Sequence, residues 1–302
     1  MSAFSQVVSL NVRSLQPLPP STEGEAAPVL PPISLRSYIL KINSLLPSEI
    51  RIYAAAEVSK EFSARFSCTE RKYKYFFLRS SLDVERMRVA AQLLVGSHDF
   101  RNFCKIDAAN VLSFVREIRG ADIEAVQTGS EENERQLCAF VLRGSGFLWH
   151  QVRCIVAILF MVGKGQEDPD VITRMLDVGT FPRKPIYHMA PEQPLVLWDC
   201  DFGDLSFVYD DVVVHKVTQL LQTQWEELTI KSTIMRHMLD TLQPSVSDTV
   251  EAPSRKRKYV PLLERPLGPS VEELVGNLSS KRQKLYQAKR QRVEEYDAKK
   301  DA

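Results

Sequence analysis

The sequence predicts an α+β protein, and three observations carry that prediction. Residues 71–78 and 195–201 are short apolar or alternating runs of the length that strands have. Residues 83–94 instead carry apolar side chains at helical spacing. Residues 114–126 and 136–143 are further strand candidates, and the acidic segment between them is typical of a hairpin turn. Strands and helices therefore intermingle in a chain of 302 residues, long enough for one large domain or two ordinary ones.

The beginning of the chain contains shorter signals. Residues 4–12 alternate in the manner of a strand, and six prolines between residues 14 and 33 favour a loop. Residues 34–46 have helical spacing and stop before Pro47. A strand with a period of two is then predicted to begin at Ile50.

Three helices are predicted in the middle of the chain. Asp83 is a candidate N-cap for the first, which Gly96 ends. The second, Phe147 to Val162, is the most apolar segment and closes at Gly163. It is shorter than the ~20 residues that span a bilayer and contains a histidine and an arginine, so we expect a helix buried in the protein and no membrane contact. A shorter helix is expected near residues 169–176.

The composition changes at Pro244 to Pro, Ser, Lys, Arg and Glu, which predicts that the compact fold ends near residue 243. Basic residues gather at 255–258 and again between 281 and 292. Such runs are typical of nuclear localisation signals or of contacts to phosphates. A solvated, partly helical tail explains them equally well, and both interpretations stay open.

Global composition excludes little. Lys plus Arg 39 against Asp plus Glu 38 leaves almost no net charge, so a nucleic-acid partner would need a local basic surface. The five cysteines are dispersed without CxxC pairs or histidine partners at zinc spacing, and we expect reduced thiols inside a cell and no metal. The first residues lack the pattern of a signal peptide.

Four longer strings carry the chemical information, because no Walker loop, GxSxG elbow or HExxH helix is present. They are Phe62-Ser63-Ala64-Arg65-Phe66, Arg71-Lys72-Tyr73-Lys74-Tyr75, Gly96-Ser97-His98-Asp99-Phe100 and Gly146-Phe147-Leu148-Trp149-His150-Gln151-Val152-Arg153.

Two of these strings suggest a site. The alternation in the second predicts Tyr73 and Tyr75 on one face of a strand and the Arg and Lys side chains on the other. Such a strand suits stacking on bases beside phosphates, and it also suits tyrosines that pack in a core. Arg153 lies on a helix that is apolar nearly all round, where a guanidinium needs a carboxylate or phosphate partner. A structural ion pair would meet that need as well.

In this order and with these separations, the strings resemble the TruA family of tRNA pseudouridine synthases. The family pattern runs FxARFSxxxRxYxY, then G-x-x-DFxxF, then FLxHQVRxxVxxLxxVG, and the matching segments are Phe62 to Tyr75, Gly96 to Phe103 and Phe147 to Gly163. Ala190-Pro191 followed by Leu195 to Trp198 resembles the closing A-P-x-x-L strand of the family. The resemblance covers residues 1 to about 205 and is closest to the eukaryotic branch.

The resemblance implies isomerisation of uridine to pseudouridine in the anticodon stem-loop of tRNA, without a cofactor. An aspartate attacks a base that is flipped into a pocket. By motif, Tyr73 would stack on that base, and Arg153 would pair with the aspartate and fill the space that the base leaves. Asp99 matches a structural position. The further candidates for contacts to the RNA or support of the pocket are Arg65, Arg71, Lys72, Lys74, Phe147 and His150.

One part of the family pattern is not in the sequence. The family aspartate lies in the string G-R-T-D-x-G-V-x-A-F, and residues 1–8 resemble only its end, so the aspartate would fall three residues before Met1. We therefore expect the 302-residue chain by itself to form no pseudouridine. The alternative hypothesis is a non-catalytic RNA-binding protein that keeps the cleft of the synthase fold.

The fold that the resemblance implies consists of two α/β lobes with a joined antiparallel or mixed sheet and a central RNA-binding cleft, the first lobe being incomplete. Four segments follow from it: a remnant of the N-terminal lobe at 1–80, the C-terminal lobe at 81–205, a helical extension at 206–243 and a basic, largely disordered tail at 244–302. The expected partners are tRNA and, as in bacterial members, a second copy of the chain. The expected compartment is the nucleus, the cytoplasm or both.

Overall fold

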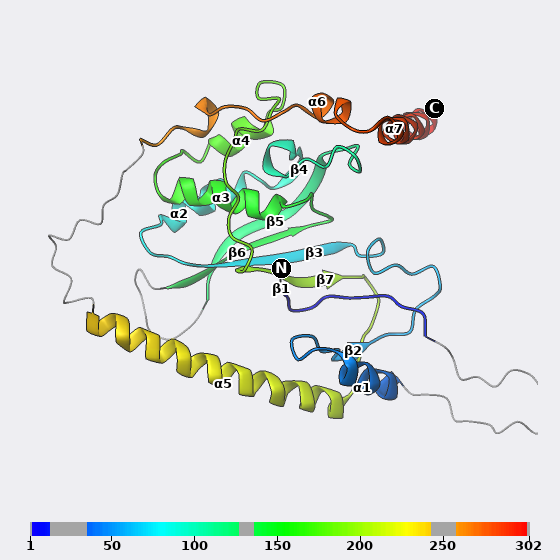
Figure 1. Ribbon diagram of the computed structural model, residues 1–302, viewed down its shortest axis with the longest axis vertical. Coiled ribbons are helices and arrows are strands. Elements are labelled where there is room, and N and C mark those ends of the chain that lie inside the picture. Colours follow the sequence, from blue (N-terminus) through cyan, green and yellow to red (C-terminus); the bar gives the residue numbers. More distant parts are fainter. Residues whose placement is uncertain (1, 13–34, 127–135, 243–257, 301–302) are drawn as a thin grey trace, which may run out of the picture. The chain divides into compact units, whose positions relative to one another are not determined.

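A computed structural model describes residues 2–12, 35–126, 136–242 and 258–300 (Figure 1). Strands and helices intermingle along the chain, which confirms the predicted α+β class. The chain forms two compact units. The first consists of Met1–Val8, Ser63–Gly203 and Lys258–Ala302, and the second of Ser9–Phe62 and Asp204–Arg257, as far as these residues are described. The division into lobes that the sequence predicts stays a prediction.

The first unit is built on a six-stranded sheet with the strand order β1-β7-β3-β6-β5-β4. All neighbours are antiparallel except β1 and β7, which are parallel. The strands are β1 (Ser2–Ala3), β3 (Glu70–Leu78), β4 (Gly96–Asp99), β5 (Val115–Ala125), β6 (Leu137–Gly144) and β7 (Leu195–Asp201). The predicted strands at 71–78, 114–126, 136–143 and 195–201 are confirmed by this list.

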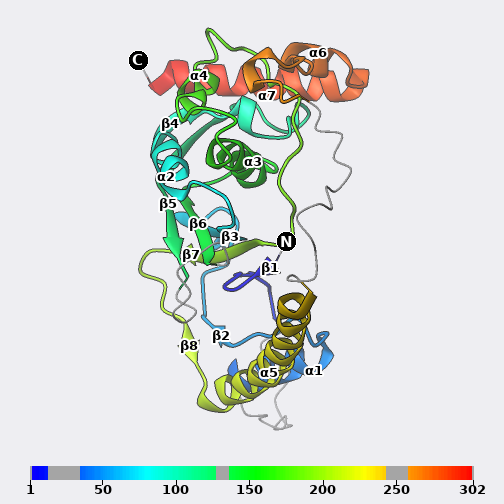
Figure 2. The ribbon, with the colours of Figure 1, turned by 90° about the vertical axis from the view of Figure 1, so that its left-hand side faces the viewer.

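Helices α2 (Val84–Gln92) and α3 (Gln151–Gly163) cover one face of this sheet (Figures 1 and 2). The Asp83 side chain caps α2, because its Oδ1 accepts a hydrogen bond from the backbone N–H of Arg86 at 3.0 Å. Ten of the thirteen residues of α3 are buried, which confirms the predicted buried helix. The α3 residues pack with those of β3, β5 and β6 in one hydrophobic core.

The described C-terminal residues belong to the same unit. Residues 266–268 run beside residues 184–186, and a preceding 3₁₀ turn (Leu262–Glu264) contains the fully buried Leu262. Two helices follow, α6 (Val271–Gly276) and α7 (Ser280–Lys300). The structure thus differs from the predicted disordered tail over residues 258–300, because apolar residues too sparse to predict a core still find partners on the lobe.

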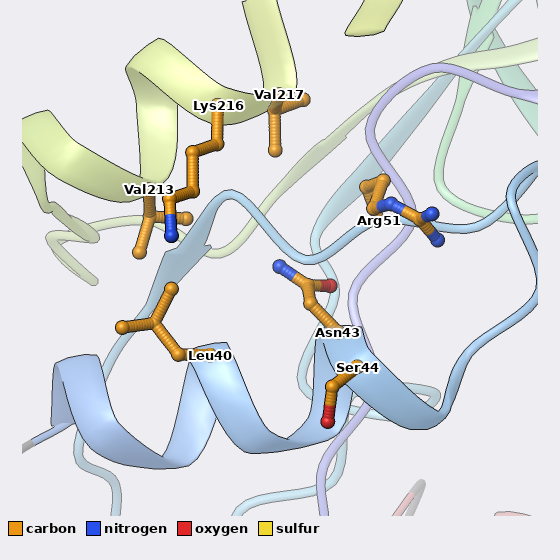
Figure 3. Close-up of a pocket in the computed structure, with 7 residues that line it drawn as sticks. All are labelled: Leu40, Asn43, Ser44, Arg51, Val213, Lys216 and Val217. Carbon is orange, nitrogen blue, oxygen red and sulfur yellow. The ribbon is translucent and has the colours of Figure 1, made fainter.

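The second unit contains α1 (Leu35–Leu45), the short antiparallel strands β2 (Ala54–Ala55) and β8 (Val208–Tyr209), and the 32-residue helix α5 (Asp211–Leu242). The predicted helix at 34–46 is confirmed as α1. A half-open cavity of about 210 Å³ lies between α1 and α5 (Figure 3). Three of its polar lining residues are engaged within the unit: Asn43 exchanges two hydrogen bonds with the backbone of Ile52, and Ser44 and Arg51 donate to the carbonyl oxygens of Lys41 and Pro47.

Three predicted details are wrong. No strand forms at 4–12: the nearest strand is Ser2–Ala3, after which only the backbone N–H of Phe4 still donates to β7, at the carbonyl oxygen of Leu197. Residues 5–12 belong to no strand of the described sheets. The strand expected from Ile50 is reduced to Ala54–Ala55. Gly96 does not end a helix but begins β4, which is too short to show a period. The loop at 14–33 and the acidic turn before residue 136 lie outside the described residues.

Candidate functional site

The predicted base-stacking residue Tyr73 lies in the middle of β3, between β6 and β7. It is paired in register with Leu142 on one side and Leu197 on the other. Its ring meets the ring of Phe147 edge-on, with centroids 5.1 Å apart. Burial raises the pKa of the Tyr73 phenol, so the group stays neutral near pH 7 and keeps its O–H as a donor.

The other predicted catalytic residue, Arg153, lies in the first turn of α3. Its Nε donates to the carbonyl oxygen of Ala190 at 2.7 Å, and the backbone N–H of Ala190 donates back to the carbonyl oxygen of Arg153 at 3.1 Å. One terminal nitrogen lies 3.3 Å from Oε2 of Glu192. The Arg153 side chain is 16% exposed but that of Glu192 is 62% exposed, so the guanidinium pairs with no buried carboxylate among the residues that the structure describes. Such a surface pair is weak and can be exchanged for another anion.

Two contacts join the segment around Arg153 to the same face of β3. Phe147 precedes α3 and meets Tyr73, while Phe160 on α3 meets Tyr75 with ring centroids 6.0 Å apart. Burial raises the pKa of Tyr75, and the nearby charge of Arg153 opposes that shift. Tyr73 and Tyr75 are two residues apart on one strand and therefore share a face. The structure thus brings Tyr73 and the helix that carries Arg153 to the same face of the sheet, where the charge of Arg153 acts on Tyr75.

The turn before α3 gathers further positive charge. His150 has a left-handed backbone with φ 59°, and its buried Nδ1 has no hydrogen-bond partner among the described residues. Burial lowers the pKa of His150, and the charges of Arg153 and Lys105 lower it further. The ammonium of Lys105 lies 4.4 Å from the centroid of the Trp149 ring, which is 50% exposed. The N-terminus of α3 adds its own partial positive charge.

Gly144 permits the approach of the Phe147 turn to the sheet. A Cβ at this position would lie 2.5 Å from the carbonyl oxygen of Glu117 and 3.3 Å from the Phe147 ring. Any other residue would therefore push the turn away from β5. This close packing explains how the string that begins at Gly146 comes to lie over Tyr73.

The arginine of the second string lies near Tyr73 and not on the opposite face. Arg71 donates to the carbonyl oxygens of Ser145, at 2.9 Å, and of Arg65, and its charge acts on Tyr73. The prediction that all the cations of this string face away from the tyrosines is wrong for Arg71, because positions 71, 73 and 75 share one parity. Arg65 itself is exposed, with its guanidinium 5.4 Å from the Phe66 ring centroid.

The two lysines of the string have the other parity. Lys74 forms an ion pair with Glu124 and lies 4.4 Å from the centroid of the Trp198 ring. Lys72 pairs in register with Arg143 and Asp199. The structure therefore does not bring the lysines to the face that carries Tyr73.

Sequence reasoning missed three residues at this site. Lys105 and Trp149 flank the turn before α3, and Glu192 pairs with Arg153. Trp149 stands inside one of the four strings, so its position there was the signal that could have marked it as a site residue. Nothing in the sequence marked Lys105 or Glu192, because their roles depend on contacts across 44 and 39 residues of chain.

The arrangement can hold a flat ring and an anion side by side. Tyr73 and Phe147 offer aromatic surface, and Arg153 offers a guanidinium held in place by a backbone carbonyl. Such a guanidinium can bind a carboxylate or phosphate with two parallel hydrogen bonds. Within the described residues, no three His, Cys, Asp or Glu side chains group as metal ligands would. No helix in that part of the chain is long and apolar enough to cross a membrane.

Comparisons with known proteins agree with this arrangement. A sequence family described as tRNA pseudouridine synthase matches residues 90–203. The chain is 39% identical to the tRNA pseudouridine(38/39) synthase of Mus musculus, over 93% of this chain and 65% of that protein. It is 43% identical to the Homo sapiens protein of the same name, over 84% of this chain and 53% of that protein. It is 32% identical to the probable tRNA pseudouridine synthase tag-124 of Caenorhabditis elegans, over 98% of this chain and 78% of that protein.

The chain belongs to the tRNA pseudouridine synthase family. The resemblance to the eukaryotic branch is confirmed by the mouse and human relatives. The chain spans only 65% and 53% of the length of those two proteins. The roles assigned to the individual site residues stay predictions.

Proposed function

We propose that this chain is part of a tRNA pseudouridine synthase that isomerises uridine in the anticodon stem-loop of tRNA. The relatives are named for positions 38 and 39, which lie in that stem-loop, and the same positions are the proposed target. The observation that carries the proposal is the packing of the segment that carries Phe147 and Arg153 on the face of the sheet that carries Tyr73 and Tyr75.

Each of the two residues has a distinct part in the proposed reaction. The reaction replaces the bond between C1′ and N1 by a bond between C1′ and C5, and the proton on C5 is exchanged for one on N1. A flipped uracil would stack on Tyr73, whose neutral phenol can donate a hydrogen bond to a carbonyl oxygen. Arg153 would leave the exposed Glu192 and bind the attacking carboxylate, which the family places in its G-R-T-D string.

The positive potential at the start of α3 supports this assignment of Arg153. The lowered pKa of His150 reflects burial together with the positive charges of Arg153 and Lys105. A carboxylate brought to this point would be stabilised in its ionised, nucleophilic form. The neutral His150 would add no further cation near pH 7.

The test is tRNA binding and turnover in the same set of variants. Turnover is measured as release of tritium from [5-³H]uridine in tRNA, with a segment that supplies the family string G-R-T-D placed before the chain. Tyr73→Ala and Arg153→Ala should each lower turnover by about 10²–10³-fold, because each removes an interaction made at the reacting base. The Kd for tRNA should change little, since many phosphate contacts share the binding.

The matched control is Lys74→Ala, which removes a cation from the same strand but from the opposite face. The turnover of this variant should stay within a few-fold of that of the unsubstituted protein. Full turnover in Tyr73→Ala or Arg153→Ala would refute the assigned roles. Tight tRNA binding without any tritium release from the unsubstituted protein would favour the non-catalytic RNA-binding protein instead.

A further inference from the structure

Helix α7 carries the highest density of positive charge among the described residues. Its cations between residues 281 and 292 are Lys281, Arg282, Lys284, Lys289, Arg290 and Arg292, and no acidic residue interrupts them. Lys281 and Lys284 are three residues apart, as are Lys289 and Arg292. Like charges at this spacing repel each other and disfavour the helix in isolation. A helix built in this way is stabilised by an external array of negative charge.

Three of these six cations lie on the side of α7 that faces away from the protein. Tyr286 is buried, and Gln283 donates to the carbonyl oxygens of Gly276, at 2.7 Å, and Leu278, at 2.9 Å, so these residues mark the attached side. Lys281, Lys284 and Arg292 stand at positions i, i+3 and i+11 and project away from Tyr286. All three are exposed, and none makes a hydrogen bond or ion pair with another residue whose side chain the structure describes, which in α7 means up to residue 293.

The segment before α7 is fastened to the lobe that holds the candidate site. Oε1 of Glu167 accepts from the Tyr259 hydroxyl at 2.5 Å and from the backbone N–H of Leu262 at 2.6 Å. The backbone N–H of Gly268 donates to the carbonyl oxygen of Lys184 at 2.8 Å. The Lys184 ammonium reaches the Sγ of Cys154 at 3.3 Å, one residue after Arg153 on α3.

These contacts hold α7 in the same compact unit as Tyr73 and Arg153. Both views place α6 and α7 at the end of this unit that carries α4 (Val171–Leu176) and β4 (Figures 1 and 2). Further contacts secure the junction. Ser270 and Glu273 form a reciprocal capping box at the start of α6, and a nitrogen of Arg183 lies 3.6 Å from a carboxylate oxygen of Glu273.

We propose that the exposed face of α7 formed by Lys281, Lys284 and Arg292 binds the phosphate backbone of the tRNA substrate, at a distance from the flipped base. The inference rests on the proposed function. Lys281 and Arg292 are eleven residues apart and therefore about 16 Å apart along the helix axis, a length that reaches several consecutive phosphates of an RNA strand. Contacts of this kind read no sequence, so the face adds affinity and orientation while the pocket selects the base.

The experiment measures tRNA binding by the 302-residue chain at a series of salt concentrations. The triple variant Lys281→Gln, Lys284→Gln, Arg292→Gln removes three charges and keeps good helix formers. It should bind tRNA about 10–100-fold more weakly near 0.1 M salt. It should also lower the slope of log Kd against log salt by about 2–3, since each phosphate contact contributes roughly 0.7–0.9. Far-ultraviolet circular dichroism checks that α7 stays folded.

The matched control is Lys281→Arg, Lys284→Arg, Arg292→Lys, which keeps every charge and should bind with the unchanged salt slope. An unchanged slope in the glutamine variant would overturn the inference and leave the proposed function standing, provided that the unsubstituted chain binds tRNA. A loss of affinity with no change of slope would also overturn it, because the loss would then come from altered structure. Failure of the unsubstituted chain to bind any tRNA would instead refute the proposed function.

Discussion

The two faces of β3 carry similar residue types but have different surroundings. On one face Arg71, Tyr73 and Tyr75 lie under the turn before α3 and the helix itself. On the other face two residues pack around Trp198. The Lys74 ammonium lies 4.4 Å from the centroid of the Trp198 ring, and the Phe76 ring centroid lies 6.0 Å from it. The difference teaches that an aromatic and basic strand does not by itself mark an RNA contact. The deciding feature is which of the two faces of β3 packs against α3, the helix that carries Arg153.

The two faces also differ in how they use charge. The guanidinium of Arg153 is held by a backbone carbonyl and an exposed carboxylate, so it can change partner. The Lys74 side chain is about as buried as that of Arg153, at 14% against 16% exposed, but its ammonium is engaged by both the Glu124 carboxylate and the Trp198 ring. One cation is available to a ligand and the other is already used for packing.

Replacing Tyr75 should have the largest effect on stability and should separate two neighbours on one face. Tyr75 is 2% exposed, whereas Tyr73 is only partly buried. Tyr75→Ala should lower the free energy of unfolding by about 3–5 kcal/mol, as for other large aromatic residues in cores. Tyr73→Ala should cost roughly half as much. Urea unfolding followed by circular dichroism measures both, and equal losses would contradict the distinction between a core tyrosine and a site tyrosine.

Replacing Lys74 tests the opposite face and should have a smaller effect. Lys74→Met keeps the apolar stem but removes the ammonium from Glu124 and Trp198. The expected loss is about 1 kcal/mol in the free energy of unfolding, the sum of a partly exposed ion pair and a cation–π contact. Glu124→Gln is the control and should lower the free energy of unfolding by only part of this amount. A marked drop in tRNA affinity for Lys74→Met would show instead that this face binds RNA.

The smallest effect concerns pH and the turn before α3. The folded protein holds the pKa of His150 below its ordinary value of 6.5, first because of burial and then because of Arg153 and Lys105. As pH falls below about 6.5 the unfolded chain takes up this proton first, so the folded state loses stability. His150→Gln should therefore lose less stability than the unsubstituted protein between pH 7 and pH 5. Thermal unfolding at several pH values measures the difference in stability between His150→Gln and the unsubstituted protein. A difference that does not change with pH would argue against the lowered pKa of His150.

Much of the fold could be predicted because the relevant signals are local. The helix capped by Asp83 and the strand from Leu195 to Asp201 follow from spacing within a few residues. The short strand β4 could not be predicted, because four residues that begin with glycine have no readable period and pair only through β5. The strand at 4–12 was predicted from the alternation of its side chains. A strand also needs a hydrogen-bonded neighbour, and among the described residues only Ser2–Ala3 has one as a strand.

The candidate site shows the same limit. The motif strings named Tyr73, Arg153 and Phe147, and the structure places them on a common face. The contribution of Glu192 could not be predicted, because its contact with Arg153 closes a span of 39 residues. The separation of Lys74 from Tyr73 follows from strand parity, but its pairing with Trp198 depends on the neighbouring strand.

By itself the sequence determined the class of the fold, the family and the residues that carry its motifs, because these are properties of order and spacing along the chain. Tertiary structure alone decided which cations are free to bind a ligand. Lys74 is held by Glu124 and the Trp198 ring, and Arg153 is left with an exchangeable partner. The cations of α7 follow a segment, residues 258–268, that is fastened to the lobe. The reason is physical: the availability of a charge depends on burial and on neighbours that lie far away in sequence.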